Sequence, residues 1–289
     1  MEEKDRKVCD ILSLAEKIRK SFKDSKSAMS ISTGEEMTTP VEPEDFVVMP
    51  EWWQQGTGVL GLPFGYCVMV SGRPDSGKTS CVIEAIRCAQ QQNYYVVLAD
   101  TERKTTISRL NGWGVDPKKL ARIQPAHLED MYDGIDHWWK AIKEKDPNSK
   151  ILVIVDSLGN TPSYQEVNNK VGDTLQLGIA AKVNKRGLRR LLPILHRDDV
   201  ALLLINQTYS NMTSVGKTNA GGQIVDFVAC LTYQTSRKMW IEKVTKGKKV
   251  RVGAQMIWTL TKNHLLEKDT FKEKTITLNI TSEGIKLAK

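Results

Sequence analysis

The sequence predicts an α/β protein in which helices flank a mostly parallel central sheet. Two observations carry this prediction. Near-continuous aliphatic runs, typical of strands covered on both faces, recur through the middle of the chain, and mixed segments long enough for helices separate them. After residue 228 the pattern changes to alternating residues and short turns, which indicates antiparallel strands or hairpins near the C-terminus.

Each expected strand follows from its local composition. The aliphatic runs predict parallel strands at residues 66–70, 95–99, 151–155 and 201–205. The later segments predict antiparallel strands at residues 230–235, 240–244, 249–257, 258–262 and 274–280. Lysine and glycine at residues 246–248 predict a turn between two of these strands.

The first 50 residues differ from the rest of the chain. Apolar residues recur at three- and four-residue spacing between Ile11 and Phe22, which predicts an amphipathic helix within residues 1–26. Residues 25–50 are rich in Ser and Thr and contain three prolines, so we expect a linker there. The predicted organisation is an N-terminal helix and linker at residues 1–50, followed by one domain at residues 51–289. The helix must bury its apolar stripe on its own domain or on a neighbouring subunit.

Composition narrows the classes of function. The 289 residues are 40% hydrophobic and 26% charged, as expected for a protein that buries its own core. No apolar run approaches the roughly 20 residues that cross a bilayer, and the N-terminus has no secretory pattern, so we expect a cytoplasmic protein without a membrane partner. Five scattered cysteines and four histidines show neither CxxC nor metal spacing, which argues against disulfides and a transition-metal site. The net charge of +8 suits a polyanionic partner, although it also fits a merely soluble basic protein.

A phosphate-binding motif follows the first aliphatic run. The motif G-x-x-x-x-G-K-[ST] is matched by Gly72, Arg73, Pro74, Asp75, Ser76, Gly77, Lys78 and Thr79, and Ser80 continues into a predicted helix at residues 80–90. The glycines let backbone N–H groups point at phosphates, the Lys78 ammonium neutralises them, and the Thr79 hydroxyl can ligate Mg²⁺. An apolar strand before the loop and a helix after it match the structural context that this motif requires.

A second Mg²⁺ ligand is expected at the end of another strand. Asp156 directly follows the aliphatic run at residues 151–155. By itself, an aspartate in this position is also typical of a turn or a helix cap. Because the phosphate motif is present, the sequence favours a site in which Asp156 and Thr79 meet at the carboxyl edge of the sheet.

Two further strands end in groups that suit nucleotide hydrolysis. The run at residues 95–99 leads into Asp100 and Glu102, and either carboxylate could orient or deprotonate the attacking water. The run at residues 201–205 leads into Asn206 and Gln207. A neutral amide at that position can hydrogen-bond the terminal phosphate and report its loss to the loop that follows.

A basic helix forms a candidate site for a polynucleotide. No acidic residue lies between residues 182 and 197, and the predicted helix there carries Lys182, Lys185, Arg186, Arg189 and Arg190. Positions 182, 185 or 186, and 189 share one helix face, so they form a strip of positive charge for phosphate contacts. The alternative is a solvated basic face, which most charge runs are.

A second basic cluster lies in the late hairpin, at Lys243, Lys246, Lys248, Lys249 and Arg251. It would widen the electrostatic footprint for a polyanion or simply keep a protruding hairpin soluble. The sequence leaves both interpretations open.

The motifs together resemble one family. They are LPFG at residues 62–65, the phosphate loop, DTE at 100–102, GVD at 114–116, DSLGN at 156–160, GIAAK at 178–182, LINQ at 204–207, the glycine pair at 221–222 and KN at 262–263. In order and spacing the chain resembles the RecA recombinases, especially their phage UvsX relatives, from about residue 60 to residue 284. The resemblance implies a RecA-like P-loop ATPase core at residues 51–289 with ATP and Mg²⁺ as its cofactors. It also implies that the N-terminal helix, which stands in the place of the family's polymerisation helix, is an oligomerisation helix that docks on a neighbouring subunit.

The resemblance also implies roles for individual residues. Glu102 would activate water, and Gln207 would link the terminal phosphate to DNA affinity. In such filaments the nucleotide lies between subunits, and the neighbour's basic residues match Lys262 and His264 here; the family usually has Lys or Arg at the second position. Arg109 stands where bacterial members place a tyrosine against the base, which leaves the nucleotide preference open.

The DNA site implied by the resemblance comprises two loops and the basic helix. The loops correspond to residues 162–177 and 208–220 here. The matched DNA-contacting positions are Leu177, Lys182, Lys185, Arg189, Tyr209, Met212, Gly221 and Gly222. Leu177 and Met212 stand where the family inserts apolar side chains between base triplets, although each could instead make an ordinary hydrophobic contact.

The sequence therefore predicts an ATP-dependent DNA recombinase, in a bacterium or a phage-infected host. It would form helical homo-oligomers on single-stranded DNA and pair that strand with duplex DNA. Three alternatives stay open: a RecA-like accessory paralogue, a ring helicase on the same core, and a small-molecule P-loop kinase. The chain ends at residue 289, whereas bacterial members continue with another small domain, so we expect filament formation to be less affected than full strand exchange.

Overall fold

The parallel strands of the main sheet end together at one edge, and this edge positions the candidate site. The computed structural model describes residues 40–159, 161–168, 178–197, 199–210, 217–219, 222, 224–245, 247–265 and 274–288, with the backbone alone at 209, 210 and 217–219. Across the main sheet the strands are, in order, β12 (Gly284–Leu287), β11 (Lys274–Thr281), β10 (Lys248–Asn263), β9 (Ala229–Thr245), β3 (Cys67–Gly72), β7 (Val200–Ser210), β6 (Ile151–Asp156), β4 (Tyr95–Asp100) and β5 (Ala121–Ile123).

Strand direction divides this sheet in two. Neighbouring strands from β9 to β5 pair in parallel, whereas β9, β10, β11 and β12 pair antiparallel. The register sets Gly72 opposite Gln207, and Asp100 opposite Asp156. The predicted α/β class, with a mostly parallel sheet and antiparallel strands near the C-terminus, is confirmed.

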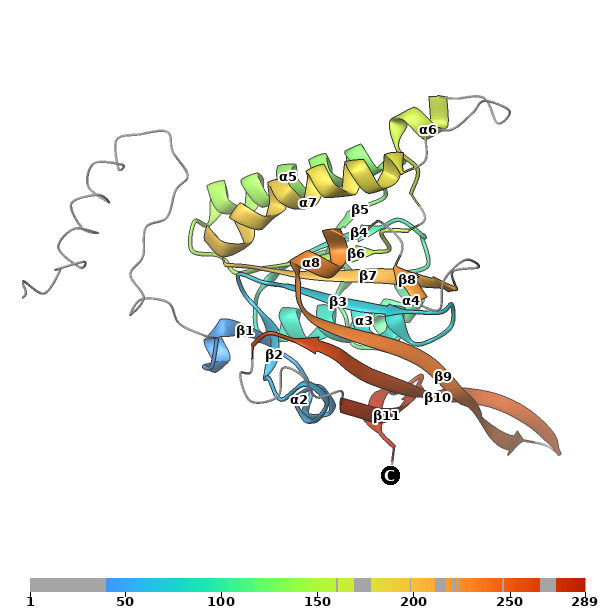
Figure 1. Ribbon diagram of the computed structural model, residues 1–289. Coiled ribbons are helices and arrows are strands. Elements are labelled where there is room, and N and C mark those ends of the chain that lie inside the picture. Colours follow the sequence, from blue (N-terminus) through green and yellow to red (C-terminus); the bar gives the residue numbers. More distant parts are fainter. Residues whose placement is uncertain are drawn as a thin grey trace, which may run out of the picture. The chain divides into compact units, whose positions relative to one another are not determined.

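Helices cover both faces of the sheet. The long helices α5 (Leu128–Lys145) and α7 (Ile179–Arg197) lie side by side over one face, and α3 (Lys78–Gln91) lies on the other (Figure 1). The shorter elements are η2 (Pro43–Asp45), β1 (Phe46–Val48), α2 (Glu51–Thr57), β2 (Gly61–Pro63), α4 (Ile107–Gly112), η3 (Pro117–Lys119), α6 (Tyr164–Asn168), β8 (Lys217–Asn219) and α8 (Ile224–Val228). In the part of the chain that the structure describes, no helix is long and apolar enough to cross a membrane.

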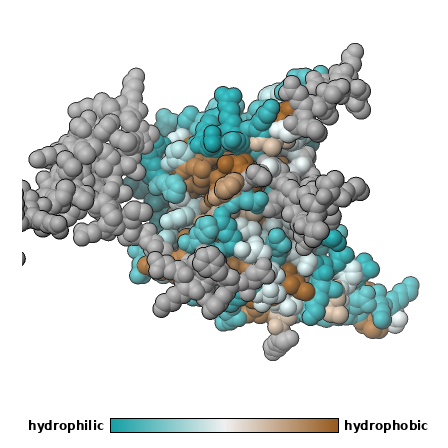
Figure 2. Space-filling model, viewed as in Figure 1, coloured by the Kyte–Doolittle hydropathy of each residue, from teal (hydrophilic) through white to brown (hydrophobic). Residues whose placement is uncertain are grey.

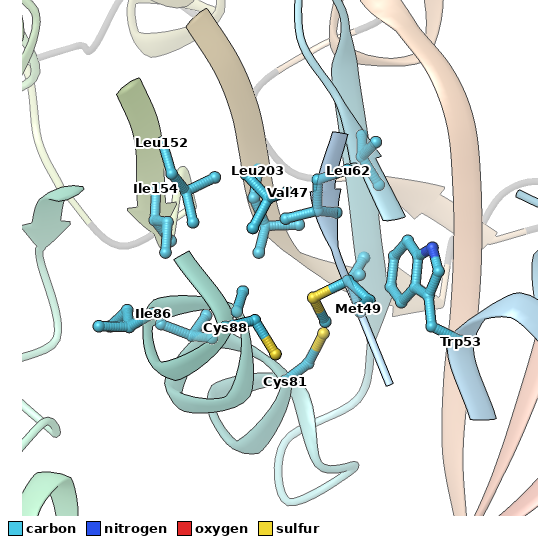
Figure 3. Packing of buried hydrophobic residues seen from close by; sticks show 14 of the residues in the cluster. Val47, Met49, Trp53, Leu62, Cys81, Ile86, Cys88, Leu152, Ile154 and Leu203 are labelled. Carbon is cyan, nitrogen blue, oxygen red and sulfur yellow. The ribbon is translucent and has the colours of Figure 1, made fainter. Parts of the chain in front are cut away.

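The alternation of side chains along the strands builds two apolar layers. On β6, Leu152 and Ile154 pack with α3, while Val153 and Val155 pack with α5 and α7. Figure 3 shows Leu152 and Ile154 beside Ile86 of α3. Because every residue of β6 is buried, the strand reads as the continuous aliphatic run seen in the sequence.

The four predicted parallel strands correspond to β3, β4, β6 and β7, and the predicted turn lies between β9 and β10. The antiparallel prediction is wrong in one respect. Residues 230–235 and 240–244 belong to one continuous strand, β9, and residues 249–262 belong to β10. From Ser236 the β9–β10 ribbon is largely exposed, so its side chains no longer alternate between core and solvent and the strand pattern is interrupted.

The end of the predicted linker is part of the core. The three prolines favoured a linker up to residue 50, but β1 runs between two of them and pairs with β2. Phe46 and Val47 are fully buried, and the Gln92 side chain exchanges hydrogen bonds with the backbone of Val48. The predicted helix within residues 1–26 lies outside the described residues, and the domain boundary at residue 50 stays a prediction.

Candidate nucleotide-binding site and basic groove

The phosphate loop connects β3 to α3 at the carboxyl edge of the parallel strands. Gly77 has φ +87°, a conformation that glycine adopts without steric cost. A Cβ atom at Gly77 would lie 2.5 Å from the Ile280 side chain, and one at Gly72 would lie 2.4 Å from the Thr235 carbonyl oxygen. Close packing against the backbone of β9 therefore requires glycine at position 72, and the positive φ favours glycine at position 77.

A cavity of about 360 Å³ opens beside this loop. Its lining residues are Pro74, Asp75, Ser76, Gly77, Lys78, Thr79, Ser80, Glu102, Lys104, Arg109, Asp156, Gln207, Trp240, Gly253, Ala254, Met256 and Ile280. The first turn of α3 lies in this wall, so its backbone N–H groups and helix dipole favour an anion there. Residues far apart in the sequence thus meet around one anion site.

Lys78 is held by the loop itself. Its Nζ donates hydrogen bonds to the carbonyl oxygens of Gly72 and Arg73, at 2.9 and 2.7 Å. Burial lowers the pKa of Lys78, while the charges of Asp156 and Glu102 act in the opposite direction. The ammonium is therefore already oriented by the backbone at the position where the motif places phosphate.

Thr79 and Asp156 meet as predicted. The Thr79 hydroxyl donates a hydrogen bond to Asp156 Oδ2 at 3.1 Å. Burial raises the pKa of Asp156 to about 6, with a further increase from the charges of Glu102 and Asp100, although the Thr79 hydrogen bond and Lys78 lower it. A divalent cation would favour the ionised form. One hydroxyl and one carboxylate fit Mg²⁺, which takes few protein ligands and completes its shell with water and phosphate.

The structure separates the two carboxylate candidates after β4. Glu102 lines the cavity: its Oε1 accepts hydrogen bonds from Gln207 Nε2 at 2.7 Å and from Ser157 Oγ at 3.0 Å, and Lys104 pairs with Oε2. Burial alone would raise the pKa of Glu102, but the hydrogen bonds from Lys104, Ser157 and Gln207 lower it overall. At neutral pH Glu102 is an ionised carboxylate, as a group that accepts a proton from water must be.

Asp100 occupies a different environment. It is buried, its Oδ2 pairs with Arg122 of β5 at 2.5 Å, and the same oxygen accepts a hydrogen bond from the Thr105 backbone. These contacts join β4, β5 and the loop after β4. Asp100 therefore supports the loop that carries Glu102.

Arg109 also reaches the cavity. It lies on α4, whose first turn is capped by the Thr106 hydroxyl, and its guanidinium donates to Ser80 Oγ at 3.1 Å. Burial lowers the pKa of Arg109, opposed by the charge of Asp156. Its planar guanidinium lines the cavity wall, where a base could stack on it.

Lys262 and His264 lie at the opposite edge of the sheet. Lys262 is paired with Thr232 on β9, and the His264 backbone donates to the Cys230 carbonyl oxygen at 2.9 Å. Thr232 lies opposite Met69 in the first half of β3, and Cys230 lies still closer to the start of that strand, whereas the phosphate loop follows its end. Within one chain, the structure therefore does not bring these two residues to the cavity.

Several residues of the site were not predicted from the sequence. Lys104 and Ser157 contact Glu102, and Trp240 reaches the cavity from the β9–β10 ribbon. The guanidinium groups of Arg237 and Arg251 lie 4.1 and 4.7 Å from the Trp240 ring centroid. Ser157 could have been assigned to the site, since it follows Asp156 in the DSLGN motif. The residues around Trp240 predict only a strand of a hairpin, so the sequence did not indicate that Trp240 reaches the cavity.

A basic groove lies along α7. Its volume is about 510 Å³, and its lining residues are Ala181, Lys182, Lys185, Arg189, Gly222, Ile224 and Phe227. Four predicted DNA-contacting positions are thus brought together, three from α7 and one from the glycine pair. Phe227 of α8, which sequence analysis missed, is 77% exposed beside them, and Figure 2 shows hydrophobic surface over α8 next to hydrophilic surface.

The basic residues of α7 do not all share one face. Arg190 pairs with Asp133 at 2.6 Å and with Asp136 at 2.9 Å, both on α5. Arg190 therefore joins the two helices, and it is not one of the positions predicted for the DNA strip. Successive helical residues are rotated by about 100°, which turns Arg190 away from Arg189.

The second predicted loop is partly a strand pair. Residues 208–210 extend β7 and pair antiparallel with β8, so Thr208 lies opposite Asn219. The predicted loop at residues 208–220 is therefore wrong at residues 208–210 and 217–219, which are strands. The backbone of Tyr209 belongs to β7, whereas Leu177, Met212 and Gly221 lie outside the described residues.

The sequence profile of the RecA N-terminal domain matches residues 13–286. The chain belongs to the RecA family. It is 27% identical to Protein RecA of Ureaplasma parvum over 214 residues, which are 73% of this chain and 61% of that protein. It is 29% identical to Protein RecA of Mycoplasma pneumoniae over 185 residues, 63% of this chain and 52% of that protein.

A third relative is Protein RecA of Thermotoga petrophila, at 27% identity over 197 residues. That match covers 67% of this chain and 52% of the relative. The chain thus spans between about half and about three fifths of the RecA proteins that it matches.

Proposed function

We propose that the chain is a DNA-dependent ATPase that acts as a recombinase on single-stranded DNA. The observation that carries the proposal is the hydrogen bond of 2.7 Å between Gln207 and Glu102. It joins the carboxylate beside the phosphate loop to the strand β7 that leads toward the predicted DNA-binding segments. Membership of the RecA family supports the same reading.

Different cavity residues would bind the phosphates, hold Mg²⁺ and activate the attacking water. Lys78 and the backbone of the phosphate loop bind the phosphates, and Thr79 with Asp156 would hold Mg²⁺, which neutralises developing phosphate charge. Glu102 orients the attacking water and accepts its proton. The water oxygen bonds to the terminal phosphorus as the bond to the bridging oxygen of ADP breaks, and ADP and phosphate leave.

Gln207 couples this chemistry to DNA. Its amide would exchange the Glu102 contact for the terminal phosphate, and the loss of that phosphate would shift the end of β7 and the strand pair with β8. Gly222 and α8 follow β8 in the chain and border the basic groove. Lys182, Lys185 and Arg189 in this groove would contact the phosphates of a single strand.

We further propose that ATP is shared between copies of the chain. Lys262 and His264 lie at the edge of the sheet away from the phosphate loop, so they would act on the nucleotide of a neighbouring subunit. A repeated head-to-tail contact of this kind generates a helical filament or a ring. The residues matched to the DNA site in the family would then line its axis, in a bacterial or phage-infected cytoplasm.

The test is ATP turnover with and without single-stranded DNA, on samples that are also imaged by negative-stain microscopy. We expect DNA-stimulated hydrolysis together with helical filaments, and strand exchange with homologous duplex. ATP binding without stimulation or filaments would contradict the recombinase and support an accessory paralogue. Closed rings that unwind duplex DNA would instead support a helicase.

A further inference from the structure

Lys104 occupies an unusual position in the cavity, beside the proposed catalytic carboxylate. It lies two residues after Glu102, and the chain turns between them at Arg103, which has φ +54°. A residue other than glycine is uncommon in this left-handed conformation and needs support from its surroundings. The turn sets the Lys104 ammonium against Glu102 Oε2, with which it forms an ion pair.

Lys104 also faces the phosphate side of the same cavity. It lines the cavity together with Lys78 and Thr79, and its side chain is 63% exposed, so the ammonium can move. The Glu102 hydrogen bond raises the pKa of Lys104, burial opposes this, and the charges of Glu102, Asp156 and Asp75 add to the increase. Lys104 is thus a solvent-exposed cation among the carboxylates of Glu102, Asp156 and Asp75.

The ion pair constrains Glu102. One carboxylate oxygen accepts hydrogen bonds from Gln207 and Ser157, and the other pairs with Lys104. An ammonium bound to one oxygen lowers the proton affinity of a carboxylate, so the ion pair makes Glu102 a weaker base. Glu102 would become a stronger base if Lys104 moved to another anion.

We propose that Lys104 leaves its ion pair with Glu102 when ATP binds and contacts the terminal phosphate instead. One movement of Lys104 would then both bind the substrate and remove the ammonium from Glu102. An ammonium is a compact charge that binds phosphate oxygens readily, and the terminal phosphate carries more negative charge than one carboxylate. No covalent bond changes in this exchange. ADP lacks the terminal phosphate and would leave the ion pair intact, so Lys104 makes the site sensitive to the difference between ATP and ADP.

The inference rests on the proposed function, and it is tested by binding alone. The dissociation constants of the β,γ-imido analogue of ATP and of ADP are measured by calorimetry on the full chain with Mg²⁺. We expect Lys104→Met to weaken binding of the analogue about tenfold and to change ADP binding by less than about twofold. Lys104→Arg should retain most of the affinity. Lys286→Met removes an exposed lysine of β12 and serves as the charge-matched control.

A double-variant cycle separates phosphate binding from simple charge neutralisation. In Glu102→Gln, Lys104 has no carboxylate partner at position 102 to leave, so the analogue should bind more tightly than to the wild type. Adding Lys104→Met to Glu102→Gln should still weaken binding of the analogue about tenfold. If the added substitution has no effect, Lys104 only neutralises Glu102 and the inference is overturned.

The outcomes also distinguish the inference from the proposed function. A wild type that binds the analogue and shows the Lys104 effect, but does not hydrolyse ATP, would support the inference and contradict the ATPase. If the chain hydrolyses ATP but Lys104→Met weakens binding of ADP and of the analogue equally, the inference alone would be overturned. A chain that binds neither nucleotide would overturn both.

Discussion

Gln207 Nε2 donates a hydrogen bond of 2.7 Å to Glu102 Oε1, which joins β7 to the loop after β4. These strands are separated by β6 in the sheet, so the contact crosses over the end of β6 next to Asp156. The pair connects the proposed chemical step to the segment that leads toward the DNA site. It predicts that the two functions can be uncoupled by one substitution.

Gln207→Ala should retain ATP binding, because the phosphate loop and Lys78 are unchanged. We expect the stimulation of hydrolysis by single-stranded DNA to fall at least about tenfold, since the link between Glu102 and β7 is lost. The measurement is ATP turnover across a DNA titration. Full stimulation in the variant would show that Gln207 is not the link.

Asp156→Asn should stabilise the protein in EDTA while abolishing Mg²⁺-dependent nucleotide binding. Burial raises the pKa of Asp156 from 3.8 to about 6, so the native state favours the protonated form and loses stability as the pH rises from about 4 to about 6. Asparagine keeps an acceptor for Thr79 and removes this loss. We expect a gain of about 2 kcal/mol in the free energy of unfolding at pH 7.5.

Urea denaturation at pH 7.5 and at pH 4 measures this effect. The gain in the free energy of unfolding of Asp156→Asn over the wild type should be smaller at pH 4, where the wild-type carboxyl is largely protonated in the native state. An advantage that is the same at both pH values would show that the effect comes from something other than the charge of Asp156.

Arg189→Ala and Arg190→Ala are a matched pair on one helix. Arg189 lines the basic groove, so its loss should weaken binding to single-stranded DNA and reduce the slope of log K against log salt by about one. Arg190 pairs with Asp133 and Asp136, so its loss should lower the free energy of unfolding by about 1 kcal/mol and leave the slope unchanged. Fluorescence anisotropy at several salt concentrations and urea denaturation check both. Equal slopes in the two variants would contradict the assignment of Arg189 to DNA binding and of Arg190 to the contact with α5.

Lys78→Ala and Lys262→Ala should complement each other in a mixture. Each variant by itself should lack DNA-stimulated turnover, because Lys78 and Lys262 lie at opposite edges of the sheet and both are needed at every shared site. In an equal mixture, about a quarter of the contacts would combine an intact phosphate loop with a neighbour's intact Lys262. Turnover near that fraction of the wild type supports a shared site, and an inactive mixture contradicts it.

The sequence by itself determined the local parts of the site. The phosphate loop is eight contiguous residues between a strand and a helix, so its conformation follows from nearby glycines and from Lys78 and Thr79. Asp156 and Gln207 could be placed as well, because each follows an aliphatic run and parallel strands end at a common edge. For the same reason, the order of the main elements was predictable where strands are covered on both faces.

Only the tertiary structure decided which side chains meet. The turn at Arg103 pairs Lys104 with Glu102. The orientation of α7 against α5 places Arg189 in the groove and pairs Arg190 with Asp133. Asp100 and Glu102 looked equivalent until the pairing of Arg122 with Asp100 separated them. These contacts depend on strand register, helix phase and backbone turns between distant segments, and no local pattern of residues encodes those distances.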